Sequence, residues 1–157
     1  MSDYSPQWRI EAGEGRDLGI GIIGAGGIVS GAHLPAYRAA GLRMSAIFDI
    51  DAEKASAVAD QFDIPVVAAS AEELAHRDDV DIVDVAVLPW VQPQVAGVVA
   101  EAGKHMLCQK PLAMDYATGA AIVDTAERAG VQLAVNHQMR WDAGIAASRD
   151  LVAQGVL

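Results

Sequence analysis

Residues 18–29 read LGIGIIGAGGIV, an apolar run that leads directly into a cluster of glycines. The run predicts a buried strand over Leu18 to Ile23, and the residues after the glycines, toward Ala40, predict a helix. In such a strand–turn–helix unit, one glycine permits a tight turn and a second lets a pyrophosphate approach the backbone. The helix N-terminus then offers free N–H groups to the phosphates. The stretch therefore predicts a dinucleotide-binding turn, formed by Gly24, Ala25, Gly26, Gly27 and Ile28.

An acidic residue follows the next predicted strand, Met44 to Phe48. Asp49 stands about 20 positions after Val29, where a carboxylate accepts hydrogen bonds from the adenosine ribose hydroxyls. The same carboxylate repels a 2′-phosphate, and residues 50–53 contain no arginine to offset that repulsion. We therefore expect NAD as the cofactor and NADP as the less suitable one. A purely structural glycine turn, with Asp49 as an ordinary strand-end residue, is the alternative interpretation.

The rest of the chain alternates short apolar runs with segments of helical period, which is typical of a parallel sheet covered by helices. We expect six strands and a doubly wound α/β fold, with residues 1–17 as a loose arm and 18–157 as the dinucleotide-binding domain. Asp84 interrupts an otherwise apolar strand, and nothing in the sequence explains it. Helical stripes are predicted at Ala55, Val58, Ala59 and Phe62 and at Val95, Val98, Val99 and Ala102, and a capping box of Ser70 and Glu73 opens a brief helix. Further helices are predicted at 116–129 and at 144–154. The remaining strands are predicted at Val66–Val67, Ile82–Val87, His105–Cys108 and Val131–Val135.

Composition and charge exclude several classes of protein. The chain has 157 residues, of which 21 are acidic and 11 basic, so its net charge of −10 disfavours nucleic acid and anionic membranes as partners. Apolar residues make up 52%, which excludes global disorder, and no apolar run reaches the roughly 20 residues that a bilayer requires. A single cysteine, Cys108, excludes an internal disulfide and fits a reducing compartment. The N-terminus does not read as a signal peptide. These features predict a soluble, globular, cytoplasmic protein.

Two stretches carry a family resemblance. GIIGAGGI at 21–28, followed by HLPA at 33–36, and AGKHMLCQKPL at 102–112 resemble the N-terminal domain of the glucose-fructose oxidoreductase / inositol dehydrogenase (Gfo/Idh/MocA) family. The resemblance implies a two-domain NAD(P)-dependent oxidoreductase that acts on a sugar, cyclitol or similar polyol. It also implies a Rossmann first domain and an α+β second domain that supplies much of the substrate site and the oligomer interface. That second domain is absent from this chain, so we expect a cofactor-binding half that is inactive alone.

The resemblance also assigns site residues. The family's Glu-Lys-Pro motif corresponds to residues 109–111, which implies that Lys110 lies near the nicotinamide and the substrate hydroxyl and assists proton transfer as the catalytic residue. Gln109 replaces the family's glutamate and removes a negative charge beside that lysine. A histidine that members carry after a proline is missing here, and Gln92 is expected to take its hydrogen-bonding role. The expected cofactor site is completed by Val87, Leu88, Pro89, Gln92, Gln109, Lys110, Asn136, Arg140 and Trp141.

Other interpretations stay open. The chain is either part of an oxidoreductase or a non-catalytic NAD(H)-binding or regulatory module, and S-adenosylmethionine binding is a weaker third hypothesis. Self-association into a homo-oligomer is also expected. The histidines lack the spacing of metal ligands, so no metal is expected, and positions at the surface or at helix ends are predicted for His33, His76, His105 and His137. Cys108 is predicted to pack in a strand rather than to act as a nucleophile.

Overall fold

The computed structural model describes residues 17–156, except for the side chain of Trp141. These residues form two compact units: a main unit over 17–136 and a C-terminal unit over 137–156. Each unit is described by itself. The loose arm expected over 1–17 lies outside the described residues, apart from Asp17.

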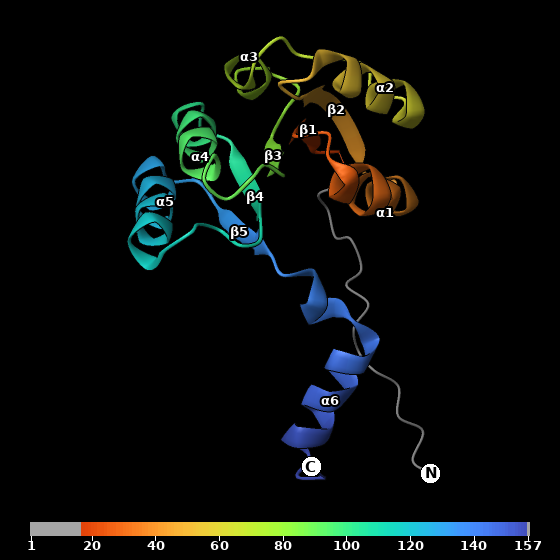
Figure 1. The fold of residues 1–157 in the computed structure, drawn as a ribbon, viewed down its shortest axis with the longest axis vertical. Coiled ribbons are helices and arrows are strands. Elements are labelled where there is room, and N and C mark those ends of the chain that lie inside the picture. The colour runs from red at the N-terminus through yellow and green to blue at the C-terminus, as the bar shows by residue number, and fades with distance from the viewer. Residues whose placement is uncertain (1–16, 157) are drawn as a thin grey trace. The chain divides into compact units, whose positions relative to one another are not determined.

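A parallel sheet forms the centre of the main unit (Figure 1). Its strand order is β2-β1-β3-β4-β5, so the order in which the strands are added reverses once, between the neighbouring strands β1 and β3. All five residues of β1 are glycine or isoleucine and all are buried, as expected for a central strand covered on both faces. The strands are β1 (Gly19–Ile23), β2 (Arg43–Phe48), β3 (Ile82–Val85), β4 (His105–Gln109) and β5 (Leu133–Asn136).

Three strand predictions need correction, and the described sheet has five strands where six were expected. The strand expected over Ile82–Val87 ends at Val85, because the chain then turns toward the helix that begins at Gln92. Val66–Val67 does not form a full strand: a single bridge pairs Val67 with Ile47, because the chain emerges from Pro65 and turns toward the next helix at Ser70. The last strand begins at Leu133 instead of Val131, because the Val131 backbone N–H donates to Ala126 O at 3.1 Å and so still belongs to the end of the preceding helix. The doubly wound parallel topology is confirmed.

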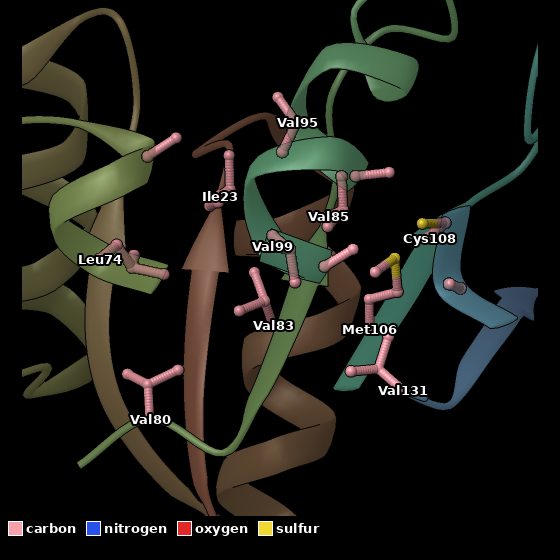
Figure 2. Packing of buried hydrophobic residues seen from close by; sticks show 14 of the residues in the cluster. Ile23, Leu74, Val80, Val83, Val85, Val95, Val99, Met106, Cys108 and Val131 are labelled. Carbon is pink, nitrogen blue, oxygen red and sulfur yellow. The ribbon is translucent and has the colours of Figure 1, made fainter. Parts of the chain in front are cut away.

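Helices cover both faces of the sheet. On one face, α3, α4 and α5 pack against alternate strand residues, and Figure 2 shows Val83 and Val85 of β3 meeting Val95 and Val99 of α4 in this layer. On the other face, Ile20 and Ile22 of β1 pack against η1, α1 and α2. Because strand side chains alternate, Asp84 belongs to this second face, between Val83 and Val85. The helices are η1 (Val29–His33), α1 (Leu34–Ala40), α2 (Ala52–Phe62), α3 (Ala71–Ala75), α4 (Gln92–Glu101) and α5 (Tyr116–Ala129).

Helix ends follow the sequence closely. Ser70 Oγ accepts a hydrogen bond from Glu73 N at 3.0 Å, and Asp115 Oδ1 accepts one from Thr118 N at 2.8 Å, so both predicted N-caps are confirmed. Gly41 and Gly130 end α1 and α5 with φ values of 69° and 70°, in the left-handed region that glycine tolerates. Local capping chemistry therefore sets these helix boundaries.

The C-terminal unit contains η2 (Gln138–Trp141) and α6 (Ala143–Ala153). Asp142 begins α6, because its Oδ1 accepts from Gly144 N at 2.9 Å and from Ile145 N at 3.0 Å. The helix predicted at 144–154 is confirmed with each bound shifted by one residue. Within residues 17–156, no helix has both the length and the apolar character needed to cross a membrane.

Candidate functional site

The glycine turn lies where β1 ends, next to the carboxyl ends of β2 and β3. Gly24 N donates to Phe48 O at 2.7 Å, which bonds the turn to the end of β2. Ala86 N, directly after β3, donates to Ile23 O at the end of β1 at 2.9 Å. Gly24 has a φ of 106°, and a Cβ at this position would lie 2.5 Å from Ala86 O. At Gly26 an added Cβ would meet nothing within 4 Å, so this backbone is open to a ligand.

Asp49 connects the end of β2 to this turn. Its Oδ2 accepts a hydrogen bond from Ala25 N at 2.7 Å, and its Oδ1 accepts one from Asp51 N at 3.0 Å. Each carboxylate oxygen has a second lone pair, so both can still accept from a hydroxyl group. The predicted acid is therefore fixed in orientation beside the predicted phosphate-binding turn.

A pocket of about 540 Å³ opens over these strand ends. Nine of the predicted site residues line it, and four, namely Ala25, Gly27, Gln92 and Asn136, do not. Arg140 and Trp141 belong to the C-terminal unit, and the Trp141 side chain lies outside the description. The nine lining residues are Gly24, Gly26, Ile28, Asp49, Val87, Leu88, Pro89, Gln109 and Lys110.

The pocket lining includes further residues that the sequence did not indicate. Lys54 lines the pocket from the first turn of α2, one position after residues 50–53, which contain no arginine. A cation is therefore present in the same pocket as Asp49, which weakens the electrostatic case against a 2′-phosphate. The strand-end pattern could have identified Ile23, Phe48, Ile50 and Ala86, which lie at or next to strand ends. Val91 and Val95 also line the pocket but belong to the start of α4, which that pattern does not mark.

Gln92 is fully buried at the start of α4. Its Nε2 donates to Pro111 O at 2.7 Å, and the Lys110–Pro111 peptide bond is cis. Gln92 therefore bonds to the backbone of the segment that carries Lys110 and does not line the pocket.

His33, which was predicted to lie at the surface or at a helix end, is the last residue of η1. It is buried there, because four polar side chains from other parts of the fold surround it. Its side chain is 7% exposed, and Asp84 is 1% exposed. His33 Nδ1 lies 2.7 Å from Asp84 Oδ2, and Tyr37 Oη donates to the same oxygen at 2.9 Å. His33 Nε2 lies 3.1 Å from Gln109 Nε2 and 3.0 Å from Asn136 Nδ2. Asp84, unexplained in the sequence, is thus the acceptor of a buried hydrogen-bond network.

Burial changes the acidity of two groups near Asp84. The pKa of Tyr37 is raised well above its ordinary value by burial and by the Asp84 carboxylate. The pKa of the Cys108 thiol is raised to about 12, chiefly by burial and secondarily by Asp84. Cys108 is a packing residue of β4, as predicted. Among residues 17–156, no cluster of three or more His, Cys, Asp or Glu side chains could hold a metal ion.

Cys108 should therefore resist alkylation in the folded chain. At about pH 8.5 iodoacetamide is expected to modify it at least 100-fold more slowly than in urea, because the reactive thiolate is rare at a pKa of about 12 and the side chain is buried. The raised pKa also means that this thiol favours the folded state below about pH 9 and that this contribution is lost as the pH rises further. Mass spectrometry of the modified chain, with Cys108→Ala as the blank, measures the rate. Equal rates in buffer and urea would contradict the burial of the thiol.

The strand order, the glycine turn after β1 and the carboxylate after β2 together define a Rossmann-type dinucleotide-binding domain. The model of the Gfo/Idh/MocA family, described as an oxidoreductase family with an NAD-binding Rossmann fold, matches residues 18–137. The chain belongs to this family, and the resemblance seen in the sequence is confirmed.

Individual relatives agree with this assignment. The chain is 36% identical over 135 residues to 1,5-anhydro-D-fructose reductase of Ensifer adhaerens, covering 86% of this chain and 40% of the relative. It is 34% identical over 133 residues to D-xylose 1-dehydrogenase (NADP(+)) 2 of Haloferax volcanii, covering 85% and 41%. A crystal structure of an Agrobacterium radiobacter oxidoreductase with NAD+, L-tartaric acid and magnesium matches with a TM-score of 0.83 and 28% identity, covering 88% and 41%. The chain thus spans about 40% of the length of these relatives.

Proposed function

We propose that this chain is the cofactor-binding domain of an NAD(P)-dependent oxidoreductase, with NAD as the preferred cofactor. In the full-length protein, hydride would pass between the nicotinamide and a hydroxyl-bearing carbon of a sugar, cyclitol or similar polyol. The observation that carries the proposal is that one pocket is lined by the glycine turn, by Asp49 and by Lys110.

The residues of the pocket fit a dinucleotide. The open backbone at Gly26 precedes the N-terminus of η1 and suits the pyrophosphate, and the Asp49 carboxylate suits the adenosine ribose. Val87 and Leu88 supply apolar surface for a planar ring. A bound nicotinamide ring supplies the acceptor or donor of the hydride.

Lys110 would handle the proton at the reacting hydroxyl. When the carbinol is oxidised, its O–H proton passes to a neutral Lys110 Nζ; when a carbonyl is reduced, the ammonium returns that proton to the new alkoxide. The charged form also stabilises the alkoxide as it develops. Asn136 does not line this pocket and contacts His33, so its proposed contribution is to the support of the site.

Calorimetric titration with the two nucleotides tests cofactor binding. In calorimetric titrations, the chain should bind NAD+ saturably, and Asp49→Asn should weaken the affinity by about tenfold, because a neutral amide makes weaker hydrogen bonds to the ribose than a carboxylate does. The same variant should improve NADP+ binding, because the charge that repels the 2′-phosphate is removed. Lys54→Ala should instead weaken NADP+ more than NAD+.

Asp60→Asn is the matched control for this titration, because it removes one carboxylate charge from an exposed site on α2 outside the pocket. It should leave both affinities unchanged. Absence of saturable binding of either nucleotide, or an equal effect of Asp49→Asn and Asp60→Asn, would overturn the proposal.

We further propose a cytoplasmic location and self-association of the full-length protein. The single cysteine supports a reducing compartment. Exposed apolar side chains such as Trp90, Tyr116 and Met114 support contact with further protein surface.

A further inference from the structure

The hydrogen bonds around His33 determine which ring nitrogen carries its proton. Lys110 N donates to Gln109 Oε1 at 2.7 Å, so the other end of this amide, Nε2, is the group that faces His33 Nε2 at 3.1 Å. An amide nitrogen only donates, and His33 Nε2 must therefore accept. The proton then resides on Nδ1, which donates to Asp84 Oδ2 at 2.7 Å. His33 is a neutral imidazole in a defined tautomer.

The surroundings of this imidazole agree with that assignment. Asn136 Nδ2 also lies 3.0 Å from His33 Nε2, so two amide donors share the single lone pair of that ring nitrogen. Asp84 Oδ2 accepts a second hydrogen bond, from Tyr37 Oη at 2.9 Å. The titratable groups that face His33 or its carboxylate, among the residues described, are Asp84 on β3, Tyr37 on α1 and Cys108 on β4. None of these three is a cation.

The network ends at the peptide that carries Lys110. Its N–H is bonded to Gln109 Oε1, and the carbonyl of the following Pro111 accepts from Gln92 Nε2 at 2.7 Å. Two buried glutamines thus fix the backbone on both sides of the cis bond. Of the two, Gln109 has its orientation set by His33, which belongs to η1, the helix directly after the glycine turn.

We propose that His33 and Asp84 are positioning residues for Lys110: they fix the Gln109 amide, and this amide fixes the Lys110 backbone at the cofactor pocket. The proposal rests on the proposed function for the role of Lys110. Because His33 lies in η1, the same network connects the helix that would bind the pyrophosphate to the residue that would handle the proton. Asp84 acts through His33, and His33 acts through Gln109.

The network requires a side chain at position 109 that can donate a hydrogen bond to neutral His33. An amide can donate to a neutral His33, but a carboxylate at this position can only accept. Glutamate at 109 would therefore require a proton on His33 Nε2, and the ring would become an imidazolium between two carboxylates. Gln109→Glu thus changes the charge of a residue that is 76 positions away in sequence.

Nitrogen-15 NMR of the histidine rings in the full 157-residue chain shows directly which His33 nitrogens are protonated. At pH 7 the His33 ring should show a protonated Nδ1 and an unprotonated Nε2, and in Gln109→Glu both nitrogens should be protonated. The His33 signals are identified with His76→Gln, His105→Gln and His137→Gln, whose parent side chains are exposed. A protonated Nε2 in the unchanged chain, or an unaltered ring in Gln109→Glu, would overturn the proposal.

Amide hydrogen exchange at Lys110 tests the positioning itself. His33→Leu removes the acceptor that orients Gln109, and it should accelerate exchange at Lys110 by about tenfold relative to Ala86, whose N–H is bonded to Ile23 O in the same sample. Tyr37→Phe is the matched control: it removes the second bond to Asp84 but leaves the chain of contacts to Lys110, so the ratio should not change. Equal acceleration at Lys110 and Ala86, or equal effects of the two variants, would overturn the proposal.

The proposed function and the positioning role can be refuted independently, because neither the ring NMR nor the hydrogen-exchange measurement uses the cofactor. A chain that shows the expected His33 tautomer and Lys110 protection but binds no nucleotide would refute the proposed function alone. A chain that binds NAD+ without these two properties would refute the positioning role alone. If His33→Leu does not fold, the ring protonation in Gln109→Glu still decides the positioning proposal.

Discussion

Gly24→Ala is expected to lower the free energy of unfolding by about 3–4 kcal/mol and to abolish nucleotide binding. A non-glycine residue at a φ of 106° costs about 1–2 kcal/mol. The added Cβ would also lie 2.5 Å from the Ala86 carbonyl oxygen, and relief of such overpacking costs about 1–3 kcal/mol. Ala86 cannot easily withdraw, because its N–H is bonded to Ile23 O at 2.9 Å. Urea unfolding followed by far-UV circular dichroism measures the loss.

Gly26→Ala is the matched control for this substitution. The same methyl group is added two positions away, where it meets nothing within 4 Å and no positive φ opposes it. The stability should therefore change by less than about 1 kcal/mol. Because Gly26 lines the pocket, NAD+ binding should still weaken by at least about tenfold. Similar stability losses in both variants would contradict the close approach of Gly24 to β3.

The sequence predicts the glycine turn and its acid well, because both depend on local order. A strand that leads directly into Gly24, and an acid after the following strand, define positions that the parallel topology must bring to one sheet edge. The structure places Asp49 Oδ2 2.7 Å from Ala25 N. The helix caps are predicted equally well, because a cap bonds to a backbone N–H only two or three residues away.

The buried hydrogen-bond network around His33 cannot be predicted from local sequence order. Asp84 and Asn136 lie 51 and 103 positions from His33 in sequence, and no periodicity brings them together. The one available indication was an acid within a β-branched strand, since a buried carboxylate requires donors from elsewhere. Gln92 shows the same limit: its position in the chain was noted, but its burial against Pro111 depends on the cis segment of another element.

Asp84→Ala is expected to destabilise the chain by about 3–5 kcal/mol. The substitution leaves two buried donors, His33 Nδ1–H and Tyr37 Oη–H, without their acceptor, and each such loss costs about 1–3 kcal/mol. Removing the side chain from a site that is 1% exposed also leaves a small cavity. Asp84→Asn retains one oxygen that can accept, so its cost should be about half as large. Urea unfolding of both variants, monitored by circular dichroism, gives the two values.

The exposed ion pair of Arg38 and Asp63 serves as a control: it shows how much stability is lost when a carboxylate charge is removed outside the core. Asp63 Oδ2 accepts from Arg38 Nη2 at 3.1 Å, but the Asp63 side chain is 91% exposed. Asp63→Asn also removes one carboxylate charge, and asparagine tolerates the φ of 56° at this position, so the stability should change by no more than about 0.5 kcal/mol. The large loss at Asp84 would then come from buried hydrogen bonds and not from net charge. If Asp84→Ala cost no more than Asp63→Asn, the His33 network could not be fixing any part of the pocket.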